Sequence, residues 1–489
     1  SGSAPAAGGA GASGVIIVKE KDKAGGMFNM NSQYNAVKVG QWPTVGRYQI
    51  NNSCRFDGSS DYLHFTPSAV GDRKTFTVST WIKFSGSYGS SGAIILNTDG
   101  SNANQNFMFQ LNSDTIKLHL YGGDVFTTSR KLRDYNAWYH IVLGIDTTQA
   151  SAGDRVKLYI NGELQSITQE SLYPAQNFDF GVGDNGRVMS IMGDHDNSNN
   201  YDNRSYISHY HFCDGYQYQA SDFGSTDSTT GEWKINTNPS VNYGSTGFFL
   251  KFENSGNLTL DSGGNNISFS TSGTPIASQD NASNVFATLN PLSTDSGVTL
   301  SSGNTESDYD GSVGHAKGTL GFSSGKFYWE VKIATSASQY PMLGIGNLDA
   351  ENMQKPTGGS YPGGFTGSYG AYGNGNVYAN GSNTGSQSFT WTTNDIIGIA
   401  VDLDSGTKTI KWYKNGSQIA IYNITTDGPF ASMDYNGGED AVNLQYNFGN
   451  GYFGTTAVSS AGTNASGNGI FEYDVPTGYT ALSTKGLNL

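Results

Sequence analysis

The chain has 489 residues, 66 of them Gly, and 14 % of its residues are charged whereas 12 % are aromatic. At about 100–200 residues per domain this length suggests roughly two to four domains, and the abundance of Tyr and Phe excludes an intrinsically disordered chain. The formal net charge is −14 without a cluster of Lys and Arg, so we expect neither nucleic acid nor an anionic membrane surface as a partner. The longest apolar run, residues 15–18, is far shorter than the ~20 residues needed for membrane insertion.

The N-terminal residues contain few side chains that can pack. Residues 1–14 are rich in Gly, Ala and Ser and lack the basic and apolar regions of a signal peptide. We therefore expect residues 1–49 to form an attachment segment that is extended or packed against another chain.

From residue 56 onward the apolar residues alternate with polar ones. Residues 76–84 place aromatic and aliphatic side chains on one face and polar side chains on the other, where Trp81 is the exception. This period of two predicts a sheet with one buried side. Similar strands are expected at 138–146, 155–160 and 205–212, with Asn-Gly, Asp-Gly and Gly-Gly turn signals between them. Because no long window has helical periodicity, the sequence predicts an all-β protein.

The strand pattern divides the chain into β-rich blocks and connections. The predicted order is an N-terminal segment at 1–49, a β-sandwich at 50–213, an irregular linker at 214–284, a second β-sandwich at 285–455 and an extended C-terminal segment at 456–489. Residues 356–388 of the second block are predicted to form a long loop rich in Gly, Tyr, Ser and Asn.

One short pattern occurs in both blocks. Residues 156–162 and 410–416 match position for position, and each runs from a strand into an Asn-Gly pair that favours a type I′ hairpin. Two sandwiches of related design would explain the match, and so would two independent hairpins with the commonest turn.

Several motifs resemble known families. Residues 55–63, 76–84, 138–142 and 207–212 resemble laminin-G-like, concanavalin A-like sandwiches. In the second block, Gly325-Lys-Phe-Tyr-Trp-Glu-Val, Leu343-Gly-Ile-Gly, Ile397-Gly-Ile-Ala-Val-Asp and Lys411-Trp-Tyr-Lys-Asn-Gly are similar to a SPRY domain. The resemblance implies two antiparallel β-sandwiches, a laminin-G or concanavalin A-like jelly roll followed by a SPRY-like sandwich.

The connecting pieces resemble bacteriophage virion proteins, especially marine ones. The motifs lie at residues 28–34, 223–233, 243–252, 284–292 and 476–484. The resemblance implies a structural and adhesive protein on the virion surface, most simply a tail fibre or appendage that helps to recognise a host glycan or receptor. A capsid-decorating head fibre is the alternative within this class. The implied partners are other virion proteins and, by analogy with fibres, further copies of the chain in a trimer.

The sequence offers no catalytic motif. Glucanases of the concanavalin A-like class carry alternating carboxylates on one strand, so that the catalytic pair lies about 5 Å apart. The chain has no such triplet, and Asp402-Leu403-Asp404 is expected to be a strand end that turns. Gly321-Phe-Ser-Ser-Gly precedes a strand rather than the helix of a nucleophile elbow. We therefore expect a non-enzymatic protein, with a polysaccharide hydrolase as the alternative from another class.

Two polar segments are candidate binding sites. Aromatic faces and amides are suited to sugars and to adaptable protein contacts. The Gly/Tyr segment offers such side chains at Tyr361, Phe365, Tyr369, Tyr372, Tyr378, Asn374 and Asn376. The alternative is a loop that only packs against other chains or is solvated. Alternating oxygen side chains at Asp194, Asp196 and Asp202 suit a Ca²⁺ ion, although the segment lacks the Gly and Glu of an EF-hand and a solvated turn is the alternative. No other cofactor is expected.

Two cysteines bracket the first sandwich. Cys54 starts its first strand and Cys213 ends its last, and in sandwiches of this kind the two strands tend to be neighbours. A disulfide between them would need Cα atoms about 4.4–6.8 Å apart. Two separate buried thiols are the alternative.

Overall fold

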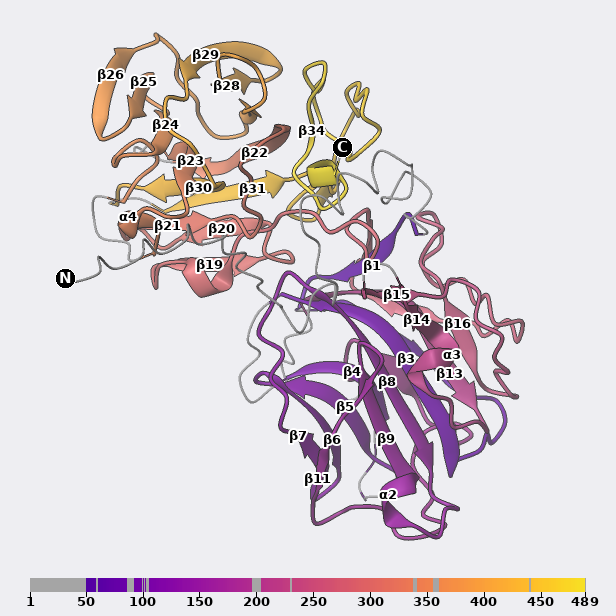
Figure 1. The fold of residues 1–489 in the computed structure, drawn as a ribbon. Helices are drawn as coiled ribbons and strands as arrows, with labels where there is room; N and C mark the ends of the chain where they lie inside the picture. The colour runs from indigo at the N-terminus through magenta and orange to yellow at the C-terminus, as the bar shows by residue number, and fades with distance from the viewer. Residues whose placement is uncertain are drawn as a thin grey trace, which may run out of the picture.

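A computed structural model describes residues 50–488 except 59, 86–91, 99, 101, 103–104, 196–203, 229–230, 337–340, 355–359 and 439–440. The chain is nearly all β, with 45 % of residues in strands and 4 % in helices. Figure 1 shows two β-sandwiches in chain order, the first coloured indigo to magenta and the second salmon pink to yellow. The predicted fold class is confirmed. The N-terminal segment 1–49 lies outside the described residues.

The first sandwich consists of two eight-stranded sheets. One has the order β10 (Glu163–Leu164), β9 (Val156–Ile160), β8 (Trp138–Asp146), β3 (Thr75–Phe84), β13 (Ser205–Asp214), β1 (Ser53–Phe56) and β18 (Ile276–Ser278), with β16 (Phe248–Leu250) also paired to β13. The other has the order β11 (Ile167–Gln169), β7 (Gly123–Thr128), β6 (Thr115–Leu120), β5 (Phe107–Asn112), β4 (Ala93–Thr98), β12 (Met189–Ile191), β2 (Tyr62–Phe65) and β17 (Ser270–Ser272). Two one-turn helices are α2 (Ala152–Arg155) and α3 (Ala220–Phe223).

The second sandwich pairs an eight-stranded with a six-stranded sheet. The larger has the order β19 (Val298–Ser301), β20 (Glu306–Tyr309), β31 (Val442–Asn447), β22 (Lys326–Ser336), β27 (Ile396–Asp402), β28 (Thr409–Lys414) and β29 (Ser417–Asn423), and β34 (Thr480–Ala481) pairs in parallel with β22. The smaller has the order β21 (Gly314–Lys317), β30 (Phe430–Asn436), β23 (Met342–Asn347), β24 (Ser368–Tyr372), β25 (Asn376–Ala379) and β26 (Ser382–Ser386). The short elements are β32 (Tyr452–Phe453), β33 (Thr456–Ala457), α4 (Glu351–Gln354) and the 3₁₀ turns Pro291–Ser293 and Gly486–Asn488.

The repeated Asn-Gly pattern forms the same turn in both sandwiches. Asn161 and Asn415 have φ angles of 49° and 47°, and both following glycines have a φ of 82°, as a type I′ turn requires. Each Asn also bonds to one residue of the neighbouring strand. Asn161 accepts from the N–H of His140 and donates to its carbonyl, and Asn415 does the same with Ile396. The predicted hairpins are confirmed.

The strand β3 is buried on both faces, not on one as predicted. Its apolar face, with Val78 and Ile82, lies in the main core between the two sheets. The opposite face is also covered, because Trp81 is 5 % and Lys83 only 1 % exposed. The polar residues of this face therefore belong to a second, interior layer rather than to the surface.

The segment predicted as a linker, 214–284, supplies much of that covering layer. It contributes β16, β17 and β18 to the sheets of the first sandwich and forms the hairpin of β14 (Gly224–Thr226) and β15 (Trp233–Ile235). The carboxylate of Asp214 accepts hydrogen bonds from the backbone of Asp72, Ser245 and Thr246 and so fixes the segment to the sheet. The segment is thus part of the sandwich and not an irregular connection.

The C-terminal segment 456–489 is likewise packed rather than extended. Phe471, Tyr479 and Leu482 lie in the core of the second sandwich. β34 pairs with the first residues of β22, next to the part of β22 that pairs with β31. The predicted extended C-terminal segment is wrong because its apolar residues complete this core.

Candidate functional site

The Gly/Tyr segment forms strands β24, β25 and β26 instead of a long loop. Phe365 and Tyr369 are buried, at 7 % and 0 % exposed. The Tyr369 hydroxyl accepts hydrogen bonds from the backbone of Thr425 and Thr426 at 3.0 and 3.2 Å. These two side chains therefore serve the interior and cannot contact a ligand without unfolding.

The remaining tyrosines of the segment are half-buried. The ring of Tyr361 lies 5.7 Å from that of Tyr378 and 5.5 Å from that of Tyr435. Tyr372 lies opposite Met342, which pairs on its other side with Tyr435. The structure therefore brings Tyr361 and Tyr378 together.

Asn374 lies in the turn between β24 and β25, and Asn376 is the first residue of β25. The Asn374 side chain is exposed and accepts a hydrogen bond from the backbone N–H of Asn376 at 3.1 Å. This bond closes the turn that leads into β25, and ligand contact by this segment stays a prediction.

The candidate Ca²⁺ residues are only partly covered by the structure. Asp196 and Asp202 lie outside the described residues, whereas Asp194 is described and half-buried. Among the residues that the structure describes, no three His, Cys, Asp or Glu side chains are grouped so that they could hold a metal ion. The Ca²⁺ site stays a prediction.

The candidate disulfide between Cys54 and Cys213 is excluded, and the alternative of two separate buried thiols is confirmed. Strands β1 and β13 are neighbours as expected, but Cys54 lies opposite Ile207, six residues before Cys213. At about 3.3 Å per residue this offset is on the order of 20 Å, far outside the disulfide range. Both cysteines are buried free thiols, and burial raises the pKa of each.

Because the thiolate is the reactive form, both cysteines should resist alkylation in the folded protein. We expect iodoacetamide at pH 8 to modify less than about a tenth of either thiol in native protein, and both thiols in unfolded protein without a reductant. Intact mass measurement checks this. A requirement for reductant before alkylation of the unfolded chain would contradict the assignment of free thiols.

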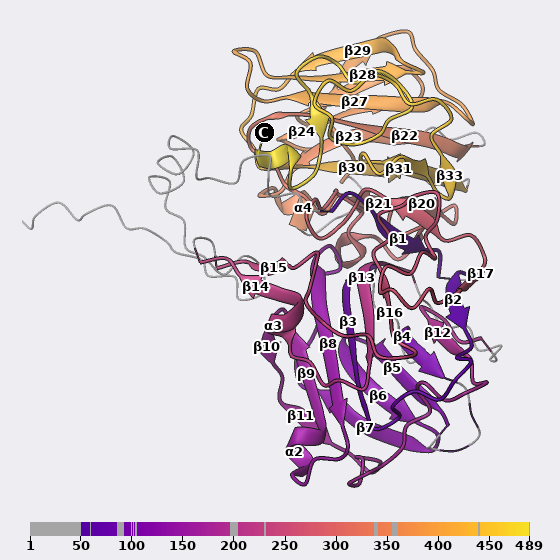
Figure 2. The same cartoon turned by 90° about the vertical axis from the view of Figure 1, so that its right-hand side faces the viewer.

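A groove of about 960 Å³ lies where the two sandwiches meet. The first sandwich contributes residues from β3, from the segment leading into β8, from the Asn161-Gly162 turn and from the β14–β15 hairpin, and the second contributes residues before β19 and near β21. Figure 2 shows the β14–β15 hairpin at the end of the first sandwich that faces the second. The aromatic lining residues are Trp81, Tyr135, Trp138 and Trp233, and the charged ones are Arg130, Arg133, Asp134, Glu163 and Glu232.

Two of these tryptophans contact a buried histidine. The His140 ring stacks on Trp81 with 5.0 Å between ring centroids, whereas the Trp233 ring lies beside it in nearly the same plane, with 5.9 Å between centroids and 19° between the planes. The Trp233 indole N–H donates to Nδ1 of His140 at 3.0 Å, so Nε2 carries the proton and donates to Ser79. Burial lowers the pKa of His140 to about 3, which keeps the ring neutral.

The turn after β9 shapes the wall beside Trp233. A Cβ atom at Gly162 would lie 2.5 Å from the indole ring, and Gly162 also has a positive φ. Only glycine meets both conditions. The Asn-Gly pair therefore makes the hairpin and also leaves room for the tryptophan.

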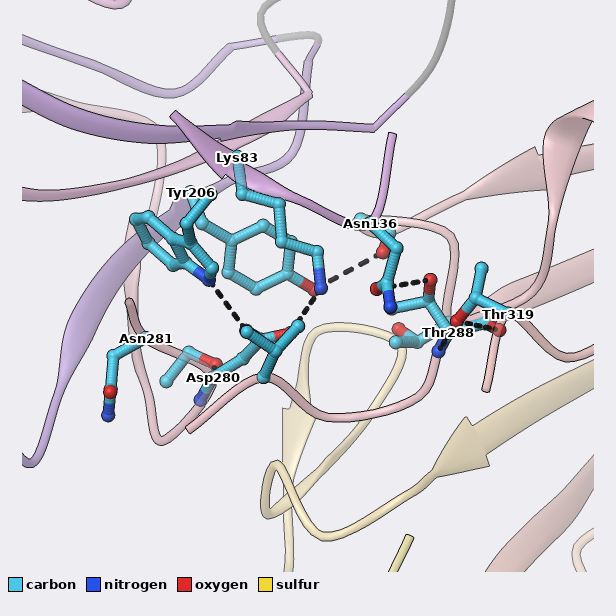
Figure 3. A network of polar contacts seen from close by, with 12 residues as sticks. Lys83, Asn136, Tyr206, Asp280, Asn281, Thr288 and Thr319 are labelled. Atoms are coloured by element: carbon cyan, nitrogen blue, oxygen red, sulfur yellow. Dashed lines mark hydrogen bonds and ion pairs between the residues drawn. The ribbon is translucent and has the colours of Figure 1, made fainter. Parts of the chain in front are cut away.

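A buried ion pair lies beneath the groove. Nζ of Lys83 is 2.5 Å from Oδ2 of Asp280, and the indole N–H of Trp138, a lining residue, donates to Oδ1 of Asp280 at 3.0 Å. Lys83 also lies over the ring of Tyr206, 5.3 Å from its centroid (Figure 3). Burial raises the pKa of Asp280, although Lys83 acts against this effect.

Further polar contacts join the two sandwiches directly. Arg55 of β1 is 2 % exposed and donates to the carbonyl oxygens of Ser302 and Gly454. Tyr206 donates to the carbonyl of Gly303 at 3.2 Å, and Thr288 donates to Asn136 at 3.3 Å (Figure 3). These contacts fix the two walls of the groove relative to each other.

Sequence reasoning missed this groove. Its residues come from positions between 81 and 484 and are brought together only when the sandwiches pack. One signal was present, since Trp81 interrupts the polar face of β3. A large aromatic at a predicted surface position indicates that something covers it.

Comparison with known families matches both halves of this architecture. Residues 57–201 match the concanavalin A-like lectin/glucanases superfamily, and residues 326–431 match the SPRY domain. The two matches support a laminin-G-like domain followed by a SPRY domain. Domains of these kinds are typically binding modules.

Solved structures give a more distant likeness. The SPRY domain of human HERC1 is 16 % identical, covers 32 % of this chain and 96 % of its own, and has a TM-score of 0.28. The stonustoxin structure is 18 % identical, covers 33 % of this chain and 27 % of its own, also with a TM-score of 0.28. No curated protein matches the chain.

Within the described residues, none of the helices has the length and hydropathy of a membrane-spanning segment.

The carboxylate motif at the end of β27 is a turn, as predicted: Asp402 accepts hydrogen bonds from the backbone of Asp404 and Ser405 at 3.0 and 2.9 Å. Gly321-Phe-Ser-Ser-Gly leads into strand β22, as expected.

Proposed function

We propose that this chain is a non-enzymatic structural protein on a virion surface, a tail fibre or appendage that binds a glycan or protein receptor of the host. The observation that carries the proposal is the aromatic-lined groove at the junction of two domains of binding-module families. Clefts at domain junctions, lined by aromatic side chains with a few polar groups, are the usual location of ligand sites.

The virion assignment is supported by the order of the connecting motifs in the sequence, which resembles phage appendage proteins. The implied partners are other virion proteins and further copies of the chain. A capsid-decorating head fibre would have the same fold and composition. Gold-labelled antibody against the chain, viewed by electron microscopy on purified particles, separates the two: label on the tail supports an appendage, and label over the head supports a decorating protein.

The non-enzymatic assignment has its own test. Incubation of purified protein with host surface polysaccharide should retain the polymer on the protein without releasing oligosaccharides. Released oligosaccharides, seen by mass spectrometry, would indicate a hydrolase instead.

A further inference from the structure

We propose that the groove between the two sandwiches is a binding site for a neutral oligosaccharide. This inference rests on the proposed binding function and names the site and its ligand class. A volume of about 960 Å³ lies at the upper end of the ~300–1,000 Å³ of small-molecule sites and leaves room for several sugar rings.

The aromatic wall is already ordered for stacking. Trp233 is half-buried, so part of its indole stays accessible, while the hydrogen bond from its N–H to His140 fixes the orientation of the ring. A side chain that is fixed before binding loses little conformational entropy when a ligand arrives. Sugars bind to such surfaces through their C–H faces, which makes Trp233 the expected platform.

A second tryptophan of the groove has an unused hydrogen-bond donor. Trp81 lines the groove and is 5 % exposed, and its indole N–H has no acceptor among the residues that the structure describes. A buried donor without an acceptor costs about 1–3 kcal/mol. The nitrogen itself is fully covered, so a sugar hydroxyl would reach it only after the side chains around it move apart.

The charges of the groove favour a neutral ligand over an acidic one. Arg130 pairs with Glu163 at 3.1 Å, and Arg133 pairs at 2.8 Å with Asp114, a carboxylate that Lys131 also contacts at 2.7 Å. Asp134 and Glu232 also line the groove, so its walls carry charges of both signs. Such walls offer no field of one sign to attract a carboxylated or sulfated sugar, whereas hydroxyl groups can donate to the carboxylates and accept from the arginines.

The second sandwich supplies the opposite wall. Pro291 and Leu292 line the groove, and Leu292 is 69 % exposed, an unusual position for a large apolar side chain. It provides an apolar surface from the second sandwich on which a second sugar face can rest. The site is therefore formed by both domains together.

The test is calorimetric titration of the full chain with neutral tetrasaccharides of glucose, galactose, mannose and N-acetylglucosamine, alongside tetragalacturonate as the acidic probe. We expect at least one neutral probe to bind, and Trp233→Ala to weaken it at least about tenfold. Glu163→Ala, at a side chain that is 62 % exposed and so tolerant of change, should also weaken it about tenfold without altering the thermal unfolding temperature. Tyr121→Ala, at an exposed aromatic in the turn between β6 and β7, is the matched control and should bind as the unaltered chain does.

Three results would overturn the inference: preferred binding of tetragalacturonate, loss of neutral-sugar binding in Tyr378→Ala but not in Trp233→Ala and Glu163→Ala, or no binding of any neutral probe. If no sugar binds while the protein still attaches to host cells, the glycan site fails and the adhesive function stands. If the protein attaches to no cells but binds a neutral sugar in the groove, the glycan site stands and the adhesive function fails.

Discussion

Replacing Lys83 by Met is expected to lower the free energy of unfolding by about 3–5 kcal/mol, because it leaves Asp280 as an unpaired charge in the interior. The two side chains are 1 % and 2 % exposed, and water cannot take the place of the ammonium group. The Trp138 indole would be the one remaining side-chain donor to Asp280 among the contacts described above. Urea unfolding followed by tryptophan fluorescence measures the loss.

The double variant Lys83→Met/Asp280→Asn is the matched control. It removes both charges and leaves an amide oxygen that can still accept from Trp138, so most of the lost stability should return. A loss below about 1 kcal/mol in the single variant would show that Asp280 takes up a proton or finds another partner, and would contradict the role of the ion pair.

The sequence predicts the strands well and the burial of their second face poorly. Alternation within residues 76–84 identifies β3, and Asn161-Gly162 identifies the turn after β9, because both signals are local. The burial of Lys83 and Trp81 depends instead on residues about 150–200 positions later, in the β14–β15 hairpin and at Asp280. No local period contains that information.

The error at the cysteines has a related cause. The pairing of β1 with β13 follows from sandwich topology, but the register is set by which residues face the core, and this register places Ile207 opposite Cys54. The sequence could therefore predict that β1 and β13 are neighbours, but it could not predict which residue of β13 lies opposite Cys54.

The candidate ligand residues show a third limit. A mixture of Tyr, Gly and Asn is typical of exposed binding loops, yet Tyr369 is fully buried with its hydroxyl bonded to backbone N–H groups. A tyrosine whose polar end is satisfied inside the protein has the same sequence signature as one on the surface. Composition alone could not separate Tyr369 from Tyr361.

Glu330 is expected to make the protein less stable as the pH rises from about 4.5 to about 7. Its side chain is fully buried on β22 and accepts hydrogen bonds from the backbone of Glu472 and Tyr473 at 2.9 Å each, which ties the C-terminal segment to the sheet. Tyr328 and Asn447 donate to the same carboxyl group at 3.1 and 3.3 Å. Burial raises the pKa of Glu330 to about 7, since these bonds only partly offset the loss of water.

Between the ordinary pKa of 4.5 and about 7, the folded chain therefore holds a proton at Glu330 that the unfolded chain has released. Stability contributed by this group is present below pH 4.5 and is lost as the pH rises through 7, by an amount on the order of 3 kcal/mol. Glu330→Gln imitates the protonated acid at every pH. The difference in unfolding free energy between the unaltered chain and Glu330→Gln should thus fall by that amount over this range, measured by urea unfolding at half-unit steps of pH. A difference that stays constant would show that Glu330 is ionised in the folded protein throughout, held by its four donors against the cost of burial.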